Sequence, residues 1–423
     1  MSQESILDEI VTKFLLNTCR LRPQLTGPAA QAALLCAGLA TGHPDDDDAE
    51  ADFIPLTTGS VAEFYIDPML PLVGDVDVMV HHSTELAIPR GHPPPIQLPA
   101  EFSDYVRVHE IVDCHLAGYV YLQLRYLLTE CNEDNKYNYI EYENEVYLSS
   151  RYADDLSDDH GPAVLIDCSH TLVLSVDHVP CVHSLSWPPQ AADWPTRHRN
   201  YGWPDSATVD HVVSNGCDVV GVAHRQCRQD KWMGKVQWRL SFSRAEIVLL
   251  NSWMPVQQIV YHMLRVFVKT VQLTDSRNKS KTLSNYHIKT LMMWACELKS
   301  SSFWTDDLRL IRTCTDLLHT LSVWLTDALC PHYFINNCNL TDYCWTEEMI
   351  SIQILGSIDE AWLSRWFVNH YIRTCSLRCP ASFSRLFTDV STYTKLQNAV
   401  TAVVNWRLNY ALEDTLHVLQ SVE

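Results

Sequence analysis

This 423-residue sequence has no run of apolar residues long enough to cross a membrane. A membrane-spanning helix needs roughly 18 or more consecutive apolar residues. The first residues, MSQESILDEI, also lack the basic and apolar stretches of a secretory signal. We therefore expect a protein that is not exported and has no membrane partner.

The sequence also lacks regular cysteine spacing. Its 15 cysteines are scattered along the chain, which favours reduced thiols and a cytoplasmic location. One set that could be considered for zinc comprises Cys330, His332, Cys338 and Cys344. Its spacing fits no common zinc pattern, so we favour cysteines of the core.

Basic residues are few. Lysine and arginine number 31 against 51 aspartates and glutamates, a formal net charge of −20. This argues against a nucleic-acid binder, because affinity for phosphates comes from lysine and arginine. The acids concentrate in 44–52 and 130–159, which read as solvated loops. Basic residues collect in 196–235 and 265–289, so a local basic face remains open.

The composition supports a large hydrophobic core, because 47% of the residues are hydrophobic and 13 are tryptophans. At this length we expect two domains. Strand patterns occur before about residue 245, and helical patterns dominate after it. The prediction is an α+β protein with a mixed α/β N-terminal lobe at 1–245 and a helical C-terminal lobe at 246–423.

Periodicity places the individual elements. Strands are expected at 73–80, 163–167, 171–179, 218–223 and 236–243. Helices are expected at 4–20, 29–40, 102–129, 245–251, 255–271, from 284 onward, 306–329, 359–375 and 391–418.

The stretch 53–80 has the most specific chemistry. Thr58, Gly59 and Ser60 form a predicted turn whose backbone N–H groups and hydroxyl suit a phosphate. Asp75 and Asp77 follow on a strand, two residues apart and so on one face. Two adjacent carboxylates favour a divalent cation that keeps both ionised, and Mg²⁺ prefers such oxygens. A solvated turn and edge strand is the alternative interpretation.

A third acid comes from the predicted hairpin of 163–167 and 171–179. Asp177 lies in an apolar strand, where a carboxylate is unfavourable unless it is paired or bound to metal. Asp177 is therefore the candidate third metal ligand, and Asp167 is the competing candidate. Alternatively, Asp177 lies on an open face of the sheet and has no ligand role.

The strand 236–243 alternates. Trp238, Leu240 and Phe242 are expected on one face, and Arg239, Ser241 and Ser243 on the other. The polar row suits a triphosphate or a base, or else it is simply the solvated side of the strand.

Several motifs occur in one order along the chain. They are TGSVAEF (58–64), DVDVM (75–79), GPAV (161–164), LSVD (174–177), WRLSFSRAE (238–246), SNYHIKT (284–290) and HYFINNCNL (332–340). In these motifs the sequence resembles the cyclic GMP-AMP synthase-like receptors of the male-abnormal (Mab) domain group of nucleotidyltransferases. The resemblance implies a polymerase-beta-like palm and a nucleotide bound between the two lobes.

The resemblance also implies roles for individual residues. Asp75, Asp77 and Asp177 would be the catalytic carboxylates that bind Mg²⁺, with Mn²⁺ as the alternative ion. The remaining positions would contact nucleotide: Thr58, Gly59, Ser60, Arg239, Ser243, Glu246, Arg265, Asn285, Tyr286 and Lys289. Tyr286 would stack on a base.

The implied function is that of an innate immune, antiviral sensor. Such an enzyme joins ATP and a second nucleotide, GTP or UTP, into a cyclic dinucleotide when its ligand binds. The cysteine–histidine zinc insertion of vertebrate DNA sensors is missing, because no cysteine lies between Ser243 and Arg265. The resemblance to relatives without it points to double-stranded RNA as activator and to a dimer that forms on the ligand.

Two departures bear on specificity. Asn285 stands where vertebrate relatives commonly have serine, and Arg265 where relatives usually have lysine, which keeps the charge but not the shape. Two other hypotheses stay open: a catalytically inactive Mab-domain protein with a binding or developmental role, and a nucleotidyltransferase that needs no activator.

Overall fold

The computed structural model describes part of the chain. The described residues are 21–22, 53–58, 65–66, 76–132, 136–142, 145–150, 164–166, 176–271, 283–305, 309–341 and 355–372. The helices expected at 4–20, 29–40 and 391–418 lie outside these ranges.

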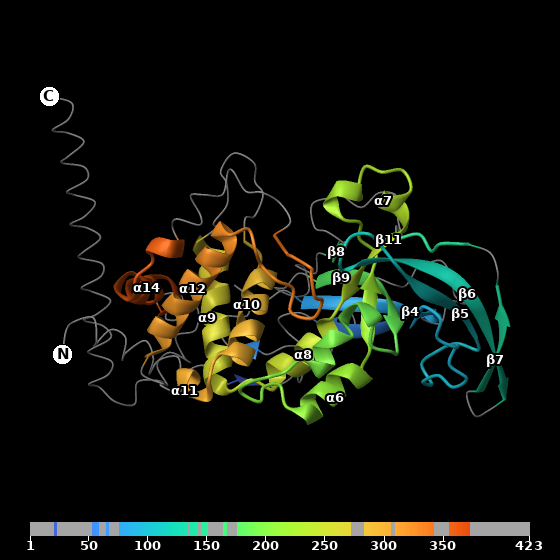
Figure 1. The fold of residues 1–423 in the computed structure, drawn as a ribbon, viewed down its shortest axis with the longest axis horizontal. Coiled ribbons are helices and arrows are strands. Elements are labelled where there is room, and N and C mark those ends of the chain that lie inside the picture. Colours follow the sequence, from blue (N-terminus) through green and yellow to red (C-terminus); the bar gives the residue numbers. More distant parts are fainter. Residues whose placement is uncertain are drawn as a thin grey trace.

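The architecture is mixed α and β, with strands at one end of the molecule and a group of helices at the other (Figure 1). The strands are β1 (Leu21–Arg22), β2 (Phe53–Thr58), β3 (Tyr65–Ile66), β4 (Val76–Pro89), β5 (Tyr105–Asp113), β6 (Tyr119–Asn132), β7 (Lys136–Glu141), β8 (Val164–Ile166), β9 (Val176–Ser184), β10 (Cys217–Val220) and β11 (Gln237–Ser241). The α-helices are α5 (Asp193–Thr196), α6 (Ser206–Ser214), α7 (Met233–Val236), α8 (Ser243–Asn251), α9 (Pro255–Val271), α10 (Asn285–Leu298), α11 (Ser301–Trp304), α12 (Leu310–Thr326) and α14 (Glu360–Trp366). Short 3-10 turns lie at Pro189–Ala191 and Arg225–Cys227, and a π-helical turn, Phe367–Ile372, continues α14.

One large sheet dominates the strand end. Its order is β2-β4-β5-β6-β11-β10-β9-β8, and β7 pairs with β6. Since β4 also pairs with β9 in parallel, the hydrogen-bonded path β4-β5-β6-β11-β10-β9 returns to β4. The long strand β4 therefore has neighbours from both the early and the late part of the sheet, and it is the element on which the site is built.

The two faces of the sheet have different neighbours. One face belongs to the main core with α6 and α8, where Val182, Val219 and Trp238 are fully buried. The opposite face carries a small apolar cluster of Met79, Cys181 and Val220. Figure 1 shows α6 and α8 below the sheet, so the second face is the one turned away from them.

The expected helix at 102–129 is wrong, because this region forms β5 and β6. Val106, Val108 and Val120 are fully buried, and β-branched residues favour a pleated surface over a helix. Gly118, with φ +82, provides the left-handed conformation just before β6 begins. The apolar residues here also fit helical spacing, which is why the pattern misled.

Several other predicted elements are present near their expected positions, whereas β7, α5, α6, α7 and α11 were not predicted. The expected hairpin is present as β8 and β9, which pair antiparallel, although the second strand runs later along the chain than predicted. Trp238, Leu240 and Phe242 are buried together as expected. Helix α9 has the predicted bounds, and α10 begins at Asn285 after a capping box formed by Ser284 and His287.

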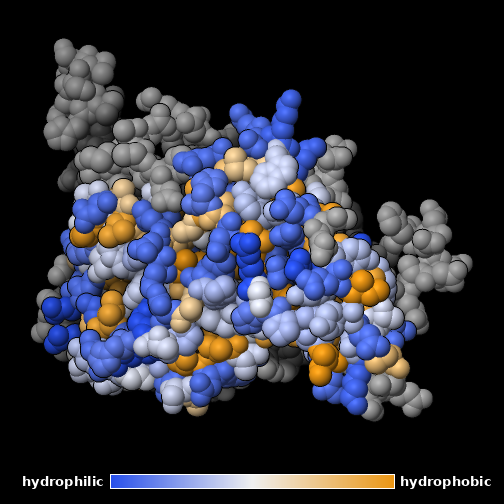
Figure 2. Space-filling view, turned by 45° about the vertical axis from the view of Figure 1, so that its right-hand side comes forward, coloured by the Kyte–Doolittle hydropathy of each residue, from blue (hydrophilic) through white to orange (hydrophobic). Residues whose placement is uncertain are grey.

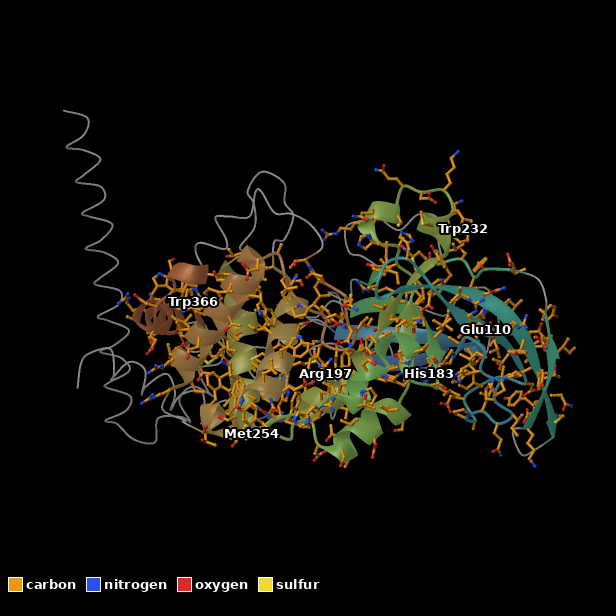
Figure 3. The ribbon with its side chains drawn as sticks, viewed as in Figure 1. Glu110, His183, Arg197, Trp232, Met254 and Trp366 are labelled. Carbon is orange, nitrogen blue, oxygen red and sulfur yellow. The ribbon has the colours of Figure 1, made fainter. Side chains whose placement is uncertain are left out.

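The strand end and the helix end share one continuous core. Phe242, which follows β11, stacks on Phe334 with 4.6 Å between ring centroids. The Arg197 guanidinium donates a 2.7 Å hydrogen bond to the Tyr333 carbonyl and pairs with the buried Glu297. Figure 3 shows Arg197 where helices and strands meet.

No helix among the described residues is long and apolar enough to cross a membrane. On the face shown in Figure 2, apolar side chains form separate small patches among hydrophilic ones.

Candidate functional site

The central feature of the candidate site is a row of three residues on neighbouring strands. Asp77 of β4 is the parallel partner of Asp177 of β9 and the antiparallel partner of Thr58 of β2. Neighbouring strands lie about 5 Å apart, and positions in register share one face of a sheet. The fold therefore places positions 77 and 177, which are 100 residues apart in the chain, side by side.

Thr58, at the end of β2, is hydrogen-bonded to the backbone of Asp77. Its side chain is buried, and its hydroxyl donates a 3.3 Å hydrogen bond to the Asp77 carbonyl. Thr58 thus fixes the backbone that carries Asp77. Of the other residues predicted for this region, Gly59, Ser60, Asp75 and Asp167 lie outside the described residues, and Asp177 is described by its strand position.

A row of hydroxyls from β11 adjoins the acidic row. The Ser241 hydroxyl contacts the Met79 sulfur at 4.0 Å, and Met79 lies two residues after Asp77 on the same face. The Ser241 and Ser243 hydroxyls are 3.1 Å apart. Ser243 is the first residue of α8, so the strand-to-helix junction brings it beside the sheet.

Arg239 has an exposed side chain. Burial raises the pKa of Tyr119, while the Arg239 guanidinium acts against this rise through its charge and a hydrogen bond. The positive charge of Arg239 also acts to lower the pKa of Tyr286 and that of His332. Arg239 of β11 and Tyr286 of α10 therefore belong to one neighbourhood, and their contact with a nucleotide stays a prediction.

Tyr286 is held by a histidine that our sequence analysis did not place at the site. The Tyr286 hydroxyl lies 3.1 Å from His332 Nε2. His332 Nδ1 accepts hydrogen bonds from the backbone N–H groups of Phe334 and Ile335, each at 3.1 Å. The only sequence signal for this role is the position of His332 at the start of the motif HYFINNCNL.

Glu246 and Lys289 form an ion pair. The Lys289 ammonium is 2.7 Å from the Glu246 carboxylate, and both side chains are largely buried. The Lys289 ammonium also lies 6.0 Å from the centroid of the Tyr286 ring. Burial, followed by the charge of Glu246, raises the pKa of Tyr286 well above its usual value, so the phenol stays protonated at neutral pH.

Asn285, the first residue of α10, has a side-chain oxygen that is shielded from solvent. Among the described residues, no donor reaches this oxygen. A buried acceptor without a donor is unfavourable, so Asn285 is suited to receive a hydrogen bond from a ligand.

Arg265 occupies a different environment. Its guanidinium lies over the Tyr261 ring, 5.4 Å from the centroid, and only 8% of the residue is exposed. Burial lowers the pKa of His262 to about 3, and the charge of Arg265 contributes to this shift. These neighbours belong to the packing of α9, and contact between Arg265 and a nucleotide stays a prediction.

Comparison with known proteins identifies the family. The Mab-21 protein nucleotidyltransferase domain matches residues 123–252, and the Mab-21 protein HhH/H2TH-like domain matches residues 256–353. Together they cover more than half of the chain. The chain belongs to the Mab-21 family. The first Mab-21 domain contains Asp177, Arg239, Ser243 and Glu246, and the second contains Tyr286 and Lys289.

The chain is also similar to part of a relative. The Mab-21 chain is similar to the zebrafish (Danio rerio) protein mab-21-like 3, with 27% identity over 180 residues. The match covers 42% of this chain and 42% of that protein. The aligned part is thus less than half of either Mab-21 protein.

The sequence predicts one metal site, of Asp75, Asp77 and Asp177, and disfavours a second one around Cys330. Within the described residues, no group of three or more His, Cys, Asp or Glu side chains is arranged for a metal ion. Cys330 is fully buried and Cys338 is half-buried, and His332 Nδ1 accepts hydrogen bonds from backbone N–H groups. Cys344 and Asp75 lie outside the described residues.

Proposed function

We propose that this Mab-21 protein is a nucleotidyltransferase that joins ATP and a second nucleotide, GTP or UTP, into a cyclic dinucleotide. The observation that carries the proposal is the register of Thr58, Asp77 and Asp177 across three neighbouring strands. Two acidic positions on adjacent strands, with the Ser241 and Ser243 hydroxyls beside the same strand, suit nucleotidyl transfer.

The donor set suits a hard divalent ion. Asp77 and Asp177, with Asp75 as the third ligand, offer carboxylate oxygens, which Mg²⁺ prefers; Mn²⁺ takes the same ligands. When bound, the ions supply charge neutralisation for the triphosphate and for the leaving pyrophosphate.

The remaining residues bind and orient the nucleotide. Arg239 presents an exposed guanidinium suited to phosphate oxygens. Ser243, together with Thr58, Gly59 and Ser60, offers hydroxyl and backbone donors. Tyr286 offers an aromatic face to a base, in an orientation fixed by His332. Lys289 and Glu246 hold each other beside that ring, and Asn285 and Arg265 complete the proposed contacts.

We further propose that the sheet region (1–245) and the helical region (246–423) act as two lobes with the nucleotide between them. In this proposal double-stranded RNA is the activator, a dimer forms on it, and the reaction takes place in the cytoplasm as part of antiviral innate immunity. The support for these points is the resemblance in the sequence motifs and the absence of a cysteine between Ser243 and Arg265.

The test is incubation of the purified protein with radiolabelled ATP plus GTP or UTP and Mg²⁺, with and without double-stranded RNA. We expect pyrophosphate release and a phosphatase-resistant product. Asp77→Asn and Asp177→Asn should each lower the rate by on the order of a hundredfold or more, as loss of a group that stabilises transition-state charge does.

The matched control is Asp210→Asn, which changes an exposed carboxylate on α6 and should leave the rate unchanged. Equal rates for Asp77→Asn and Asp210→Asn would refute the assignment of the acidic row. Nucleotide binding without any product, under all activators, would instead favour the inactive Mab-domain protein.

A further inference from the structure

The segment 225–236 forms a protrusion between β10 and β11, which we call the α7 projection. It contains the 3-10 turn Arg225–Cys227 and helix α7. Figure 1 shows it standing out beyond the sheet, on the side away from α6 and α8. Figure 2 shows hydrophilic side chains projecting at the top of the molecule, where Figure 1 has α7.

The α7 projection is strongly basic although the chain carries a net charge of −20. Its cations are Arg225, Arg228, Lys231 and Lys235; all are exposed except Arg228, which is half-buried. Its one acid, Asp230, accepts hydrogen bonds from the backbone N–H groups of Trp232 and Met233. Within the described part of the chain, no carboxylate forms an ion pair with any of the four cations.

An aromatic ring lies among these cations. Trp232 is 49% exposed, and Figure 3 labels it on the projection. Its ring packs against Tyr121 and Tyr147, with centroids at 5.0 and 5.5 Å. The tyrosines support one part of the indole and leave the rest open to solvent, so that a stacking partner would meet a ring that is already ordered.

The backbone of the projection is also firmly held. The Lys235 carbonyl accepts hydrogen bonds from the Ser150 N–H at 2.6 Å and the Ser150 hydroxyl at 2.8 Å. A Cβ on Gly234 would lie 2.7 Å from the Arg228 carbonyl oxygen, so the chain turns tightly here. The exposure of Trp232 and its neighbouring lysines is therefore a feature of the folded segment.

Other basic residues in this part of the sequence have structural roles, which sets the projection apart. Arg197 and Arg199 are largely buried and pair with Glu297. Within 196–235, the local basic face that the sequence leaves open is thus restricted to the α7 projection. The charge of Arg225 acts to lower the pKa of His287, and the charge of Arg228 acts to lower the pKa of Tyr119. The base of the projection therefore adjoins the proposed nucleotide site.

We propose that the α7 projection is a binding surface for single-stranded nucleic acid. Trp232 stacks on an unpaired base, and Lys231 and Lys235, which flank it in sequence, contact phosphates, with Arg228 and Arg225 nearer the body. Base stacking on an aromatic side chain combined with cations along a backbone is the general mode of single-strand recognition. This surface does not depend on the proposed catalytic activity.

Two other kinds of partner fit less well. An acidic peptide would use the cations but would leave the open indole face without a planar partner. A membrane surface is bound by an amphipathic helix with a continuous apolar face. Helix α7 has four residues, and Trp232, which precedes it, is the one exposed large apolar side chain of the α7 projection.

The experiment measures the binding of the full-length protein to a fluorescent oligouridylate of about 12 nucleotides, a length within the usual range of single-strand sites. Binding is followed by fluorescence anisotropy over a series of salt concentrations. A duplex RNA of the same length, polyglutamate and phosphatidylserine vesicles serve as competitors. We expect the unlabelled single strand to compete best.

The variants separate charge from stacking. Lys231→Glu with Lys235→Glu should weaken binding at least tenfold and reduce the salt slope, by roughly 0.7 for each lost phosphate contact. Trp232→Ala should weaken binding about tenfold with an unchanged slope, and Trp232→Phe should recover most of the affinity. Arg90→Glu, which reverses an exposed charge elsewhere, is the matched control and should bind as the unchanged protein does.

Three results would overturn the proposal. One is equal affinity of the double lysine variant and Arg90→Glu. The second is competition by duplex RNA, polyglutamate or vesicles that is as strong as by the single strand. The third is unchanged binding by both Trp232 variants, which are checked for folding by thermal unfolding.

Discussion

The imidazole of His332 determines how Tyr286 is presented. Because Nδ1 accepts two backbone hydrogen bonds, the ring proton is on Nε2, and Nε2–H donates to the Tyr286 oxygen. Burial, then the charges of Arg239 and Arg197, lowers the pKa of His332 to about 3. The imidazole is therefore neutral near pH 7, and the orientation of Tyr286 does not change with pH in that range.

This geometry predicts a graded effect of changes at Tyr286 on nucleotide binding. Tyr286→Phe removes the bond to His332 and keeps the ring, so affinity should fall by about 1 kcal/mol, the usual contribution of one hydrogen bond. Tyr286→Ala also removes the stacking surface and should reduce affinity by a further 1–3 kcal/mol or so. Calorimetry with a non-hydrolysable ATP analogue gives both values. Equal losses in the two variants would contradict a stacking role for the ring.

At the scale of elements, a buried ion network joins α8 to the sheet. Asp218 of β10 is completely buried, and its carboxylate is 2.9 Å from Arg244 Nε in α8 and 2.9 Å from His183 Nδ1 in β9. Burial alone would raise the pKa of Asp218, but the hydrogen bonds and charges of His183 and Arg244 hold it below its usual value. The network connects β9, the strand that carries Asp177, to α8, the helix that begins at Ser243.

Asp218→Asn should therefore be strongly destabilising. It leaves the Arg244 charge without its buried partner, and breaking such a pair reduces the free energy of unfolding by about 3–5 kcal/mol. Urea denaturation measures the change. Glu360→Gln is the control, because it removes a carboxylate from the exposed pair with Arg312 and should change stability by less than about 1 kcal/mol. A similar midpoint for the two variants would show that the network is dispensable.

At the scale of the whole molecule, several buried histidines make stability depend on pH. Burial lowers the pKa of His81 and His287 to about 4, and that of His262 and His332 to about 3. The unfolded chain binds these protons near pH 6.5. Between about pH 6.5 and 4 the unfolded state therefore holds more protons than the folded state, and stability falls as the pH is lowered.

The expected result is a Tm that is nearly constant above pH 7 and declines steadily from about pH 6.5 toward pH 4. Each of the four histidines contributes at most about 1.4 kcal/mol per pH unit in this window. Differential scanning calorimetry across the range tests this. His211→Gln changes an exposed histidine of α6 and should leave the profile unaltered. A Tm that rises as the pH falls from 6.5 would contradict the burial of neutral imidazoles.

Local patterns in the sequence were sufficient for the strand of Trp238, for α9 and for a helix that begins next to Ser284. In these places the signal lies within a few residues, such as alternation along a strand or an apolar stripe on a helix. The stretch 102–129 misled, because Val112, Leu116 and Tyr119 follow the i, i+4, i+7 spacing of a helix, although the segment forms β5 and β6. Whether such residues form a helix or a hairpin depends on which strands are available to pair with them.

For the candidate site, the sequence alone identified which residues carry suitable chemistry: an acid two residues from another, an alternating polar row, and a tyrosine in a recognisable motif. The sequence predicts that Asp177 joins Asp77 at one site, but the register that places the two positions side by side comes from the fold. The contact of His332 with Tyr286 and the sharing of Asp218 by Arg244 and His183 were not predicted. These pairings join residues that are distant in the chain, and they exist only because β4 runs parallel to β9 and because the helices pack against the strand ends. Register and packing are properties of the folded chain as a whole, since each follows from many contacts at once and none of them is encoded in a single local pattern.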